Sequence, residues 1–81
     1  MKTLAVILPT YNAAAYIKES VDSILNQTFT NFDLFVYDDC STDHTEALIK
    51  SYKDSRVHYI KNEKNLGIAK TLNKGLNELL L

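Results

Sequence analysis

The sequence has few of the residues that give other chains a strong signature. Its 81 residues include one cysteine, one proline, two glycines and no tryptophan. A single cysteine excludes a disulfide within the chain, and a free thiol is typical of a reducing compartment, so we expect a cytoplasmic protein. Nine basic and ten acidic residues give a net charge of -1, which does not favour binding to nucleic acid. A chain of this length forms one domain at most and buries only about 60 to 65% of its unfolded surface.

Long apolar runs are also absent. No stretch approaches the roughly 18 consecutive apolar residues that a membrane-spanning helix needs. The run TLAVILP near the N-terminus is short, and TYN follows it where a signal peptide would have small residues at a cleavage site. We therefore expect neither a transmembrane segment nor a signal peptide.

The first half of the chain alternates between strand and helix patterns. Branched apolar residues that stop at Pro9 predict a strand over residues 3–9, covered on both faces. Asn12 is a good N-cap, and apolar residues at helical spacing predict an amphipathic helix over residues 13–27. The run FDLFVYDD predicts a second strand over residues 32–39.

The second half continues the alternation. Asp43 and Glu46 have the spacing of a capping box at the start of a second helix. The apolar stripe of that helix comprises Thr45, Leu48, Ile49 and Tyr52. The run RVHYIKN predicts a third strand, and a third helix follows with its stripe at Ile68, Leu72, Leu76, Leu79 and Leu80. The pattern predicts a single α/β domain over residues 1–81, in which helices cover both faces of a mostly parallel three-stranded sheet.

Polar segments follow each predicted strand. Ligands of open parallel sheets bind beyond the carboxyl ends of the strands, so PTYN, DDCSTD and KNEKNLG are expected on one rim. This set suits a nucleotide, because a carboxylate can accept the ring N–H of uracil and Tyr11 can stack on the base. Since side chains alternate along a strand, Asp38 and Asp39 should point apart, which makes them a poor chelate with two separate roles.

Several of these residues also have an ordinary structural interpretation. Adjacent aspartates at a strand end are commonly solvated turn formers, and Lys64 and Lys70 could simply be solvated charges. His44 and His58 are expected to have surface or packing roles rather than catalytic ones. Cys40 would need a neighbouring base to act as a nucleophile, and the sequence does not place one beside it.

The segment LAVILPTYNAAAYIKESVDSILNQTFTNFDLFVYDDCSTDHT, followed by NEKNLGIAKTLNKGL, resembles the N-terminal nucleotide-binding half of family 2 glycosyltransferases with the GT-A fold. The resemblance implies a Rossmann-like half-domain that binds a nucleotide sugar, often a UDP-sugar, whose sugar is transferred to an acceptor hydroxyl. It also implies that Asp39 accepts the N–H of the base, while Asp38 holds the ribose or the turn. The candidate nucleotide-binding residues are Pro9, Thr10, Tyr11, Asp38, Asp39 and Lys70.

The sequence departs from the family pattern in two ways. Cys40 stands where the family usually has glycine, which costs about 1 kcal/mol if that position needs a positive φ. The D-x-D motif, which in the family holds a divalent cation such as Mn²⁺ or Mg²⁺, is absent, as is a catalytic base. We therefore expect a truncated N-terminal piece of a longer enzyme, with no catalytic or metal-binding residue of its own and no activity alone. The complete enzyme is expected in the cytoplasm, including the inner face of the membrane.

Other functions stay open at this point. A module of the same fold could bind nucleotides or partners without catalysis. A receiver domain fits poorly, because its acidic pair follows the first strand, and a dinucleotide site lacks its G-x-G-x-x-G. The sugar, the acceptor and the stereochemistry cannot be predicted.

The predicted first strand also bears on association. In the family, the second strand lies between the other two, and the segment with D-x-D packs beyond the first strand. Here the first strand would be an edge, and it has few of the charges or bulges that protect edges from pairing. We expect self-association through this strand, the third helix, or both.

Overall fold

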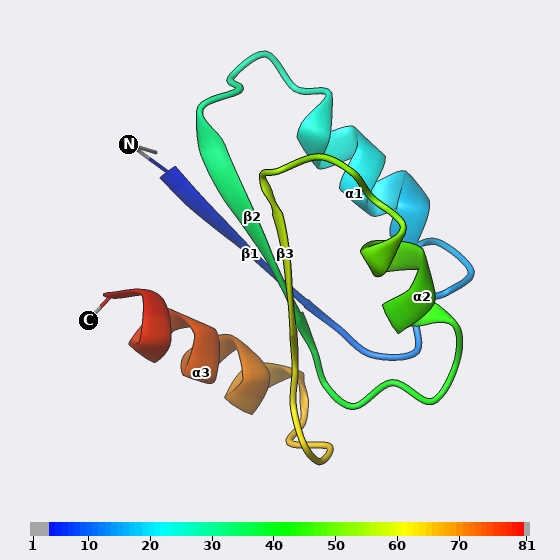
Figure 1. Ribbon diagram of the computed structural model, residues 1–81. Coiled ribbons are helices and arrows are strands. Elements are labelled where there is room, and N and C mark those ends of the chain that lie inside the picture. Colours follow the sequence, from blue (N-terminus) through cyan, green and yellow to red (C-terminus); the bar gives the residue numbers. More distant parts are fainter. Residues whose placement is uncertain (1–3, 81) are drawn as a thin grey trace.

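The structure, a computed structural model, describes residues 4–80. Its elements are β1 Leu4–Thr10, α1 Ile17–Leu25, β2 Phe32–Asp38, α2 Thr45–Lys50, β3 Val57–Lys61 and α3 Ile68–Leu80. The three strands are parallel and lie in the order β1-β2-β3. Helices α1 and α2 cover one face of the sheet and α3 covers the other (Figure 1). The predicted three-layer α/β fold with β2 in the centre is thus confirmed, while Thr3 and Leu81 lie outside the described residues.

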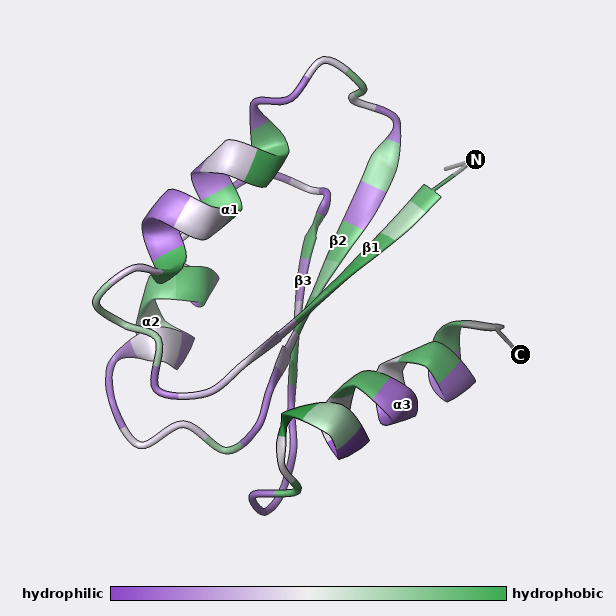
Figure 2. Ribbon diagram, turned by 180° about the vertical axis from the view of Figure 1, so that it is seen from behind, coloured by the Kyte–Doolittle hydropathy of each residue, from purple (hydrophilic) through white to green (hydrophobic). Residues whose placement is uncertain are grey.

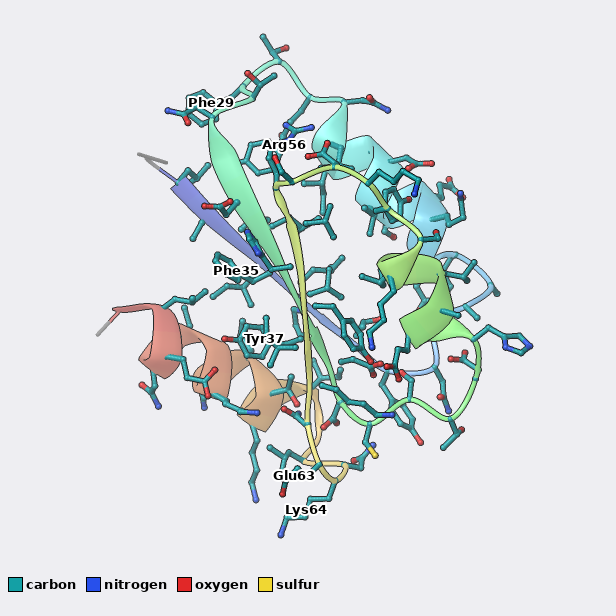
Figure 3. All side chains as sticks on the ribbon, viewed as in Figure 1. Phe29, Phe35, Tyr37, Arg56, Glu63 and Lys64 are labelled. Carbon is teal, nitrogen blue, oxygen red and sulfur yellow. The ribbon has the colours of Figure 1, made fainter. Side chains whose placement is uncertain are left out.

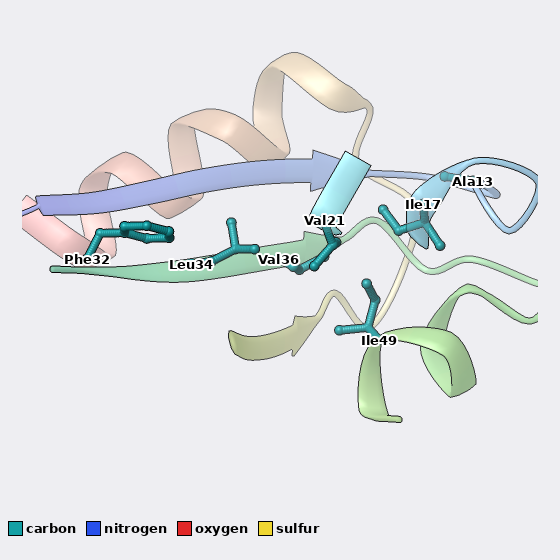
Figure 4. Close-up of a cluster of buried hydrophobic side chains, with 7 residues drawn as sticks. All are labelled: Ala13, Ile17, Val21, Phe32, Leu34, Val36 and Ile49. Carbon is teal, nitrogen blue, oxygen red and sulfur yellow. The ribbon is translucent and has the colours of Figure 1, made fainter. Parts of the chain in front are cut away.

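The apolar core lies between the sheet and the layer of α1 and α2. Alternate residues of β2 point into it and are fully buried, as expected for the central strand of a sheet. The core consists of Ala13, Ile17, Val21, Phe32, Leu34, Val36 and Ile49 (Figure 4). Val6 and Leu8 pack against it from β1. This side of the sheet is therefore stabilised mainly by the burial of apolar surface, which contributes about 25 cal/mol for each Å² removed from water.

The α3 side of the sheet is held differently. Gly75 lies in the middle of α3, and a Cβ atom there would be only 3.1 Å from the Tyr37 ring and 3.3 Å from Ile7. The Tyr37 hydroxyl donates a 2.8 Å hydrogen bond to Glu78 of the same helix. Burial, and then this hydrogen bond, raises the pKa of Tyr37 to about 12. The small Gly75 thus lets α3 approach β1 and β2 closely. None of the helices within residues 4–80 is long and apolar enough to cross a membrane.

The start of α1 differs from the prediction. The helix spans Ile17–Leu25 rather than residues 13–27, and Asn12 is not its N-cap. Asn12 has a left-handed backbone with φ of 48°, and its side-chain oxygen accepts the N–H of Thr42. The following N–H groups also bond to other parts of the chain: that of Ala13 donates to the Thr45 hydroxyl. Hydrogen bonds to residues distant in the sequence thus hold this segment as a turn, so the helix begins only at Ile17.

The capping box predicted for α2 is also wrong. The N-cap residue is His44, whose side chain makes no capping hydrogen bond. Asp43 accepts the N–H of Thr45 two residues later, whereas Glu46 pairs with lysines instead of returning to the backbone. Tyr52, predicted to continue the apolar stripe of the helix, lies beyond its end at Lys50. Its hydroxyl donates to Asp22 of α1 at 2.6 Å, so it links the segment after α2 to α1.

Candidate functional site

The carboxyl ends of the three strands meet at one rim, as the sequence predicts. The N–H of Asp39 donates to the carbonyl of Thr10 at the end of β1, at 2.8 Å. The N–H of Asn62 donates to the carbonyl of Asp38 at the end of β2, also at 2.8 Å. These two bonds continue the ladder of the sheet by one residue on each side. They bring the loops after β1, β2 and β3 next to one another.

Asp38 is fully buried and faces the α2 side of the sheet. Its Oδ1 accepts hydrogen bonds from the N–H and the hydroxyl of Ser41. Its Oδ2 accepts the hydroxyl of Tyr59 from β3 in a short hydrogen bond. Burial, and then this bond to Asp38, raises the pKa of Tyr59 well above its usual value. Asp38 therefore holds the turn after β2, one of the two roles that the sequence left open for it.

Asp39 is equally buried but points to the opposite side, toward the loop between β3 and α3. Its Oδ1 accepts the N–H of Leu66 at 2.7 Å and the side-chain amide of Asn62 at 2.9 Å. Its Oδ2 accepts the N–H of Gly67 at 2.8 Å. Burial alone would raise the pKa of Asp39, but these bonds and one from Thr71 outweigh it and lower the pKa below its usual value. The two aspartates point apart, as predicted, and Asp39 stays ionised.

Asn62 and Lys74 are the site residues that the sequence analysis missed. The amide of Asn62 is buried and donates to both Asp39 and Thr71. Its oxygen accepts the ammonium of Lys74 from α3 at 2.7 Å. Asn62 thus links the end of β2 to α3 with every polar atom of its side chain used. The position of Asn62 directly after a predicted strand could have identified it as a site residue. Lys74 could be identified only once the packing of α3 against the sheet was known.

Two loop positions have a left-handed backbone. Gly67, whose N–H reaches Asp39, has φ of 92°, a conformation that favours glycine. Cys40 has φ of 64°, which is uncommon for a residue with a Cβ atom. The position of Cys40 thus has the positive φ for which we expected a cost in place of glycine. Its thiol lies 3.8 Å from the carbonyl of Glu63.

The remaining predicted nucleotide-binding residues lie around the same rim. Thr10 is buried at the end of β1, Pro9 is half-buried beside it, and Tyr11 has 42% of its surface exposed. An exposed ring next to a strand end is free to stack on a ligand. Lys70 is exposed on α3.

A pocket of about 450 Å³ opens at the loop between β3 and α3. Its lining residues are Lys61, Asn62, Glu63, Lys64, Leu66 and Lys74. Glu63 and Lys64 lie at the tip of the loop (Figure 3). None of the six predicted residues lines the pocket, but Asn62 and Leu66 connect its wall directly to Asp39. Three lysines against one glutamate make the pocket suited to an anion.

The histidines have structural surroundings, as expected. The His58 ring stacks on Phe35 with centroids 4.8 Å apart, and its Nε2 lies 3.0 Å from Asp33. His44 is exposed at the start of α2. Within residues 4–80, no group of three or more metal-ligating side chains comes together.

The sequence matches the model of the family described as "Glycosyl transferase family 2" over residues 5–79. One relative is the E. coli enzyme "UDP-Glc:alpha-D-GlcNAc-diphosphoundecaprenol beta-1,3-glucosyltransferase WfgD". It is 38% identical over 73 residues, which are 90% of this chain and 29% of that protein. Among the curated relatives, the chain spans between 11% and 30% of their length. It thus corresponds to a minor part of each of them.

Solved structures match the fold as well. S. aureus TarS superposes with a TM-score of 0.83 and 36% identity, over 96% of this chain and 24% of that one. TarS is also known in complex with UDP. The mannosyltransferase PcManGT from Pyrobaculum calidifontis, solved with GDP-Man and Mn²⁺, has a TM-score of 0.81 and 30% identity, over 93% of this chain and 24% of that one. Both likenesses cover nearly all of the present chain.

Proposed function

Because the chain belongs to glycosyl transferase family 2, we propose that it is the donor-binding half of an enzyme that transfers a sugar from a UDP-sugar to an acceptor hydroxyl. The name of WfgD includes UDP-Glc, and TarS was solved with UDP, whereas PcManGT was solved with GDP-Man. A nucleoside diphosphate is common to all three. The choice of uracil for this chain depends on its own residues.

The observation that carries the proposal is the Asp39 carboxylate at the strand end, which accepts hydrogen bonds from the loop before α3. A carboxylate has about four acceptor positions, and Leu66, Gly67 and Asn62 occupy three of those of Asp39. The Thr71 hydroxyl holds the fourth position, and the ring N–H of uracil would bind there by displacing it. Adenine has an unprotonated ring nitrogen on the corresponding edge, which a carboxylate repels. The site should therefore prefer uracil.

Other rim residues would complete the contact with the nucleotide. The exposed ring of Tyr11 would stack on the base, while Pro9 and Thr10 flank the nucleoside at the end of β1. Stacking on an aromatic side chain contributes about 1 to 3 kcal/mol per base in other sites. Lys70 and the pocket lysine Lys74 would attract the phosphates from α3. In this arrangement the base would bind at the strand ends, and the phosphate charge would be balanced by the lysines.

The complete enzyme would also hold a divalent cation, Mn²⁺ or Mg²⁺, against the diphosphate, as the Mn²⁺ in the PcManGT structure suggests. Such a cation stabilises the leaving group in the transition state. We expect this chain alone neither to transfer nor to hydrolyse the sugar, and we expect the enzyme to act in the cytoplasm. An assay of UDP release with and without Mn²⁺ tests the first point, and metal-stimulated turnover by the pure chain would contradict it.

Titration calorimetry with UDP and ADP tests the assignment of Asp39. We expect the wild type to bind UDP weakly but about tenfold better than ADP, since a hydrogen bond to a charged group contributes about 1.5 to 3 kcal/mol. Asp39→Asn should lose this preference. Asp43→Asn is the matched control. Asp43 also accepts hydrogen bonds at the rim, from Ala14 in the loop after β1 and from Thr45 at the start of α2, and its replacement should leave the preference unchanged. Equal affinities for UDP and ADP in the wild type, or a preference that survives Asp39→Asn, would contradict the assignment.

A further inference from the structure

The hydroxyl of Thr71, in the first turn of α3, belongs to a buried polar cluster around Asp39. Asp39, Asn62 and Thr71 each have 1% or less of their surface exposed. Figure 2 shows this turn of α3 beside the end of β3, after a loop that is hydrophilic along most of its length. Within residues 4–80, no buried side-chain nitrogen or oxygen lacks a hydrogen-bond partner. The direction of each hydrogen bond in the cluster therefore follows from the chemistry of its members.

Lys74 fixes the orientation of the Asn62 amide. An ammonium group can only donate, so the Asn62 atom that lies 2.7 Å from Lys74 Nζ is the side-chain oxygen. The amide nitrogen then faces the other way and donates to Oδ1 of Asp39 and to the Thr71 hydroxyl, both at 2.9 Å. A reversed amide would place its oxygen against a carboxylate and its N–H groups against an ammonium. Asn62 is therefore a donor to both of these neighbours.

The Thr71 hydroxyl has one proton and two acceptors within its reach. Because the hydroxyl oxygen accepts from Asn62, its own proton is available for donation. In the structure this proton is donated to Asp39. The second acceptor is the carbonyl of Gly67, four residues earlier, which already accepts the N–H of Thr71 at 3.0 Å. Threonine hydroxyls in helices can donate to the carbonyl at this spacing, and a carbonyl oxygen has two lone pairs.

The other three donors to Asp39 have no such alternative. The N–H groups of Leu66 and Gly67 belong to the backbone, so they cannot turn away unless the loop itself changes conformation. The Asn62 amide is held in one orientation by Lys74. Moving any of these donors would leave a buried polar group without a partner, which is costly. A hydroxyl proton, by contrast, changes its acceptor by rotation about a single bond.

Building on the proposed function, in which Asp39 accepts an N–H of the base, we propose that Thr71 is a specificity-determining residue whose hydroxyl competes with the base for this carboxylate. When uracil binds, its ring N–H replaces the hydroxyl at Asp39, and the hydroxyl donates to the carbonyl of Gly67 instead. No buried polar group is then left unpaired. Adenine has no ring N–H on the corresponding edge and cannot make this exchange. Thr71 thus sets the affinity for uracil without affecting that for adenine.

Titration calorimetry of Thr71→Val with UDP and ADP tests this competition. Valine has nearly the shape of threonine but no hydroxyl, so uracil has nothing to displace from Asp39. We expect UDP to bind about three- to tenfold more tightly than to the wild type, because the displaced bond to a charged group is stronger than the carbonyl bond that replaces it. The affinity for ADP should stay the same. The variant should also be less stable, since the Asn62 amide loses an acceptor.

This combination of tighter binding and lower stability is not expected from a residue with a structural role alone. Thr45→Val is the matched control, because Thr45 is also fully buried in the first turn of a helix. Its hydroxyl donates to Asp43 at 2.6 Å and accepts the N–H of Ala13. Its replacement should lower the stability and leave the ratio of the UDP and ADP affinities unchanged. Thr71→Ser keeps the hydroxyl and should bind UDP as the wild type does.

NMR of the Gly67 carbonyl carbon measures the exchange of acceptors directly. We expect its resonance to shift when UDP binds to the wild type and to shift much less in Thr71→Val, which has no hydroxyl to donate. Circular dichroism verifies that each variant is folded. If valine does not fit, Thr71→Ala removes the same hydroxyl with a smaller side chain and carries the same expectation for UDP.

The outcomes distinguish the role of Thr71 from the proposed function. Equal affinities of the wild type for UDP and ADP would overturn both. A wild type that prefers UDP, together with a folded variant without the hydroxyl that binds UDP no more tightly, would overturn the role of Thr71 alone and leave Asp39 as the acceptor of the base. A parallel loss of UDP and ADP binding in that variant would also overturn it, since it would show a structural role only.

Discussion

Asp38 and Asp39 are neighbours in the chain, yet they belong to two different sides of the sheet. The partners of Asp38 are Ser41, three residues away, and Tyr59 on the adjacent strand. The partners of Asp39 lie in the loop before α3, more than twenty residues away. Asp38 is buried on the face of the sheet that the apolar core and helices α1 and α2 already cover. Asp39 is the main link between β2 and a loop that lines an open pocket.

The difference indicates which side is available for function. The α1 and α2 side buries seven apolar residues. On the α3 side, the structure has a buried polar cluster, a lysine-lined pocket and an exposed apolar stripe. A ligand or a partner can therefore be accommodated on the α3 side without opening the core.

The largest loss of stability should come from a substitution in the apolar core between the sheet and helices α1 and α2. Leu34 is fully buried in the core, and Leu34→Ala should cost about 2 to 5 kcal/mol of unfolding free energy through lost burial and a cavity. Leu72→Ala is the matched control on the open side and should cost much less, because its side chain is 36% exposed. Urea unfolding of both variants measures the contrast. Equal losses would mean that α3 is as tightly packed as the core.

A smaller effect should come from Asp39, and it should depend on pH. Its pKa is lowered in the folded state, so its contribution to stability is complete above the unfolded pKa of about 3.9 and is lost as the pH falls through the lower folded value. Asp39→Asn should cost about 1 to 3 kcal/mol at pH 7, because an amide cannot accept all of these N–H groups. The difference in unfolding free energy between Asp39→Asn and the wild type should become smaller at acidic pH.

Urea unfolding of the wild type and Asp39→Asn across the acid range provides this measurement. Asp43→Asn is a suitable comparison, because hydrogen bonding from Thr45 also lowers the pKa of Asp43, but in an exposed position. Its effect at pH 7 should be smaller. A gap for Asp39→Asn that stays constant with pH would show that its charge is not what stabilises the loop.

The smallest effect should come from the turn between the two sides, with the opposite sign. Cys40 has φ of 64°, and Cys40→Gly should raise the unfolding free energy by about 1 kcal/mol by relieving this conformation. Asn12→Gly, at φ of 48°, is the control: asparagine tolerates this region, and its side chain accepts the N–H of Thr42. Thermal unfolding should therefore rank Cys40→Gly above the wild type and Asn12→Gly below it.

The sequence was sufficient to predict features that depend on local pattern. Apolar runs predicted the three strands, and alternation along β2 predicted that Asp38 and Asp39 diverge. The errors arose where contacts distant in sequence decide local structure. Asn12 looks like an N-cap, but it bonds to Thr42, thirty positions away in the chain. Asn62 lies in the KNEKNLG segment that was expected at the rim, but its own role depends on the juxtaposition of β2 and α3.

The most direct test of the proposed uracil site is an NMR titration that follows the amides of Leu66 and Gly67. Both N–H groups donate to Asp39, so a uracil N–H that binds the same carboxylate must alter their hydrogen bonds. We predict saturable shifts of both resonances with UDP, much smaller shifts with ADP, and little change at the amide of Ser41, which donates to Asp38. Equal responses to UDP and ADP, or UDP binding that leaves Leu66 and Gly67 unperturbed, would contradict the account.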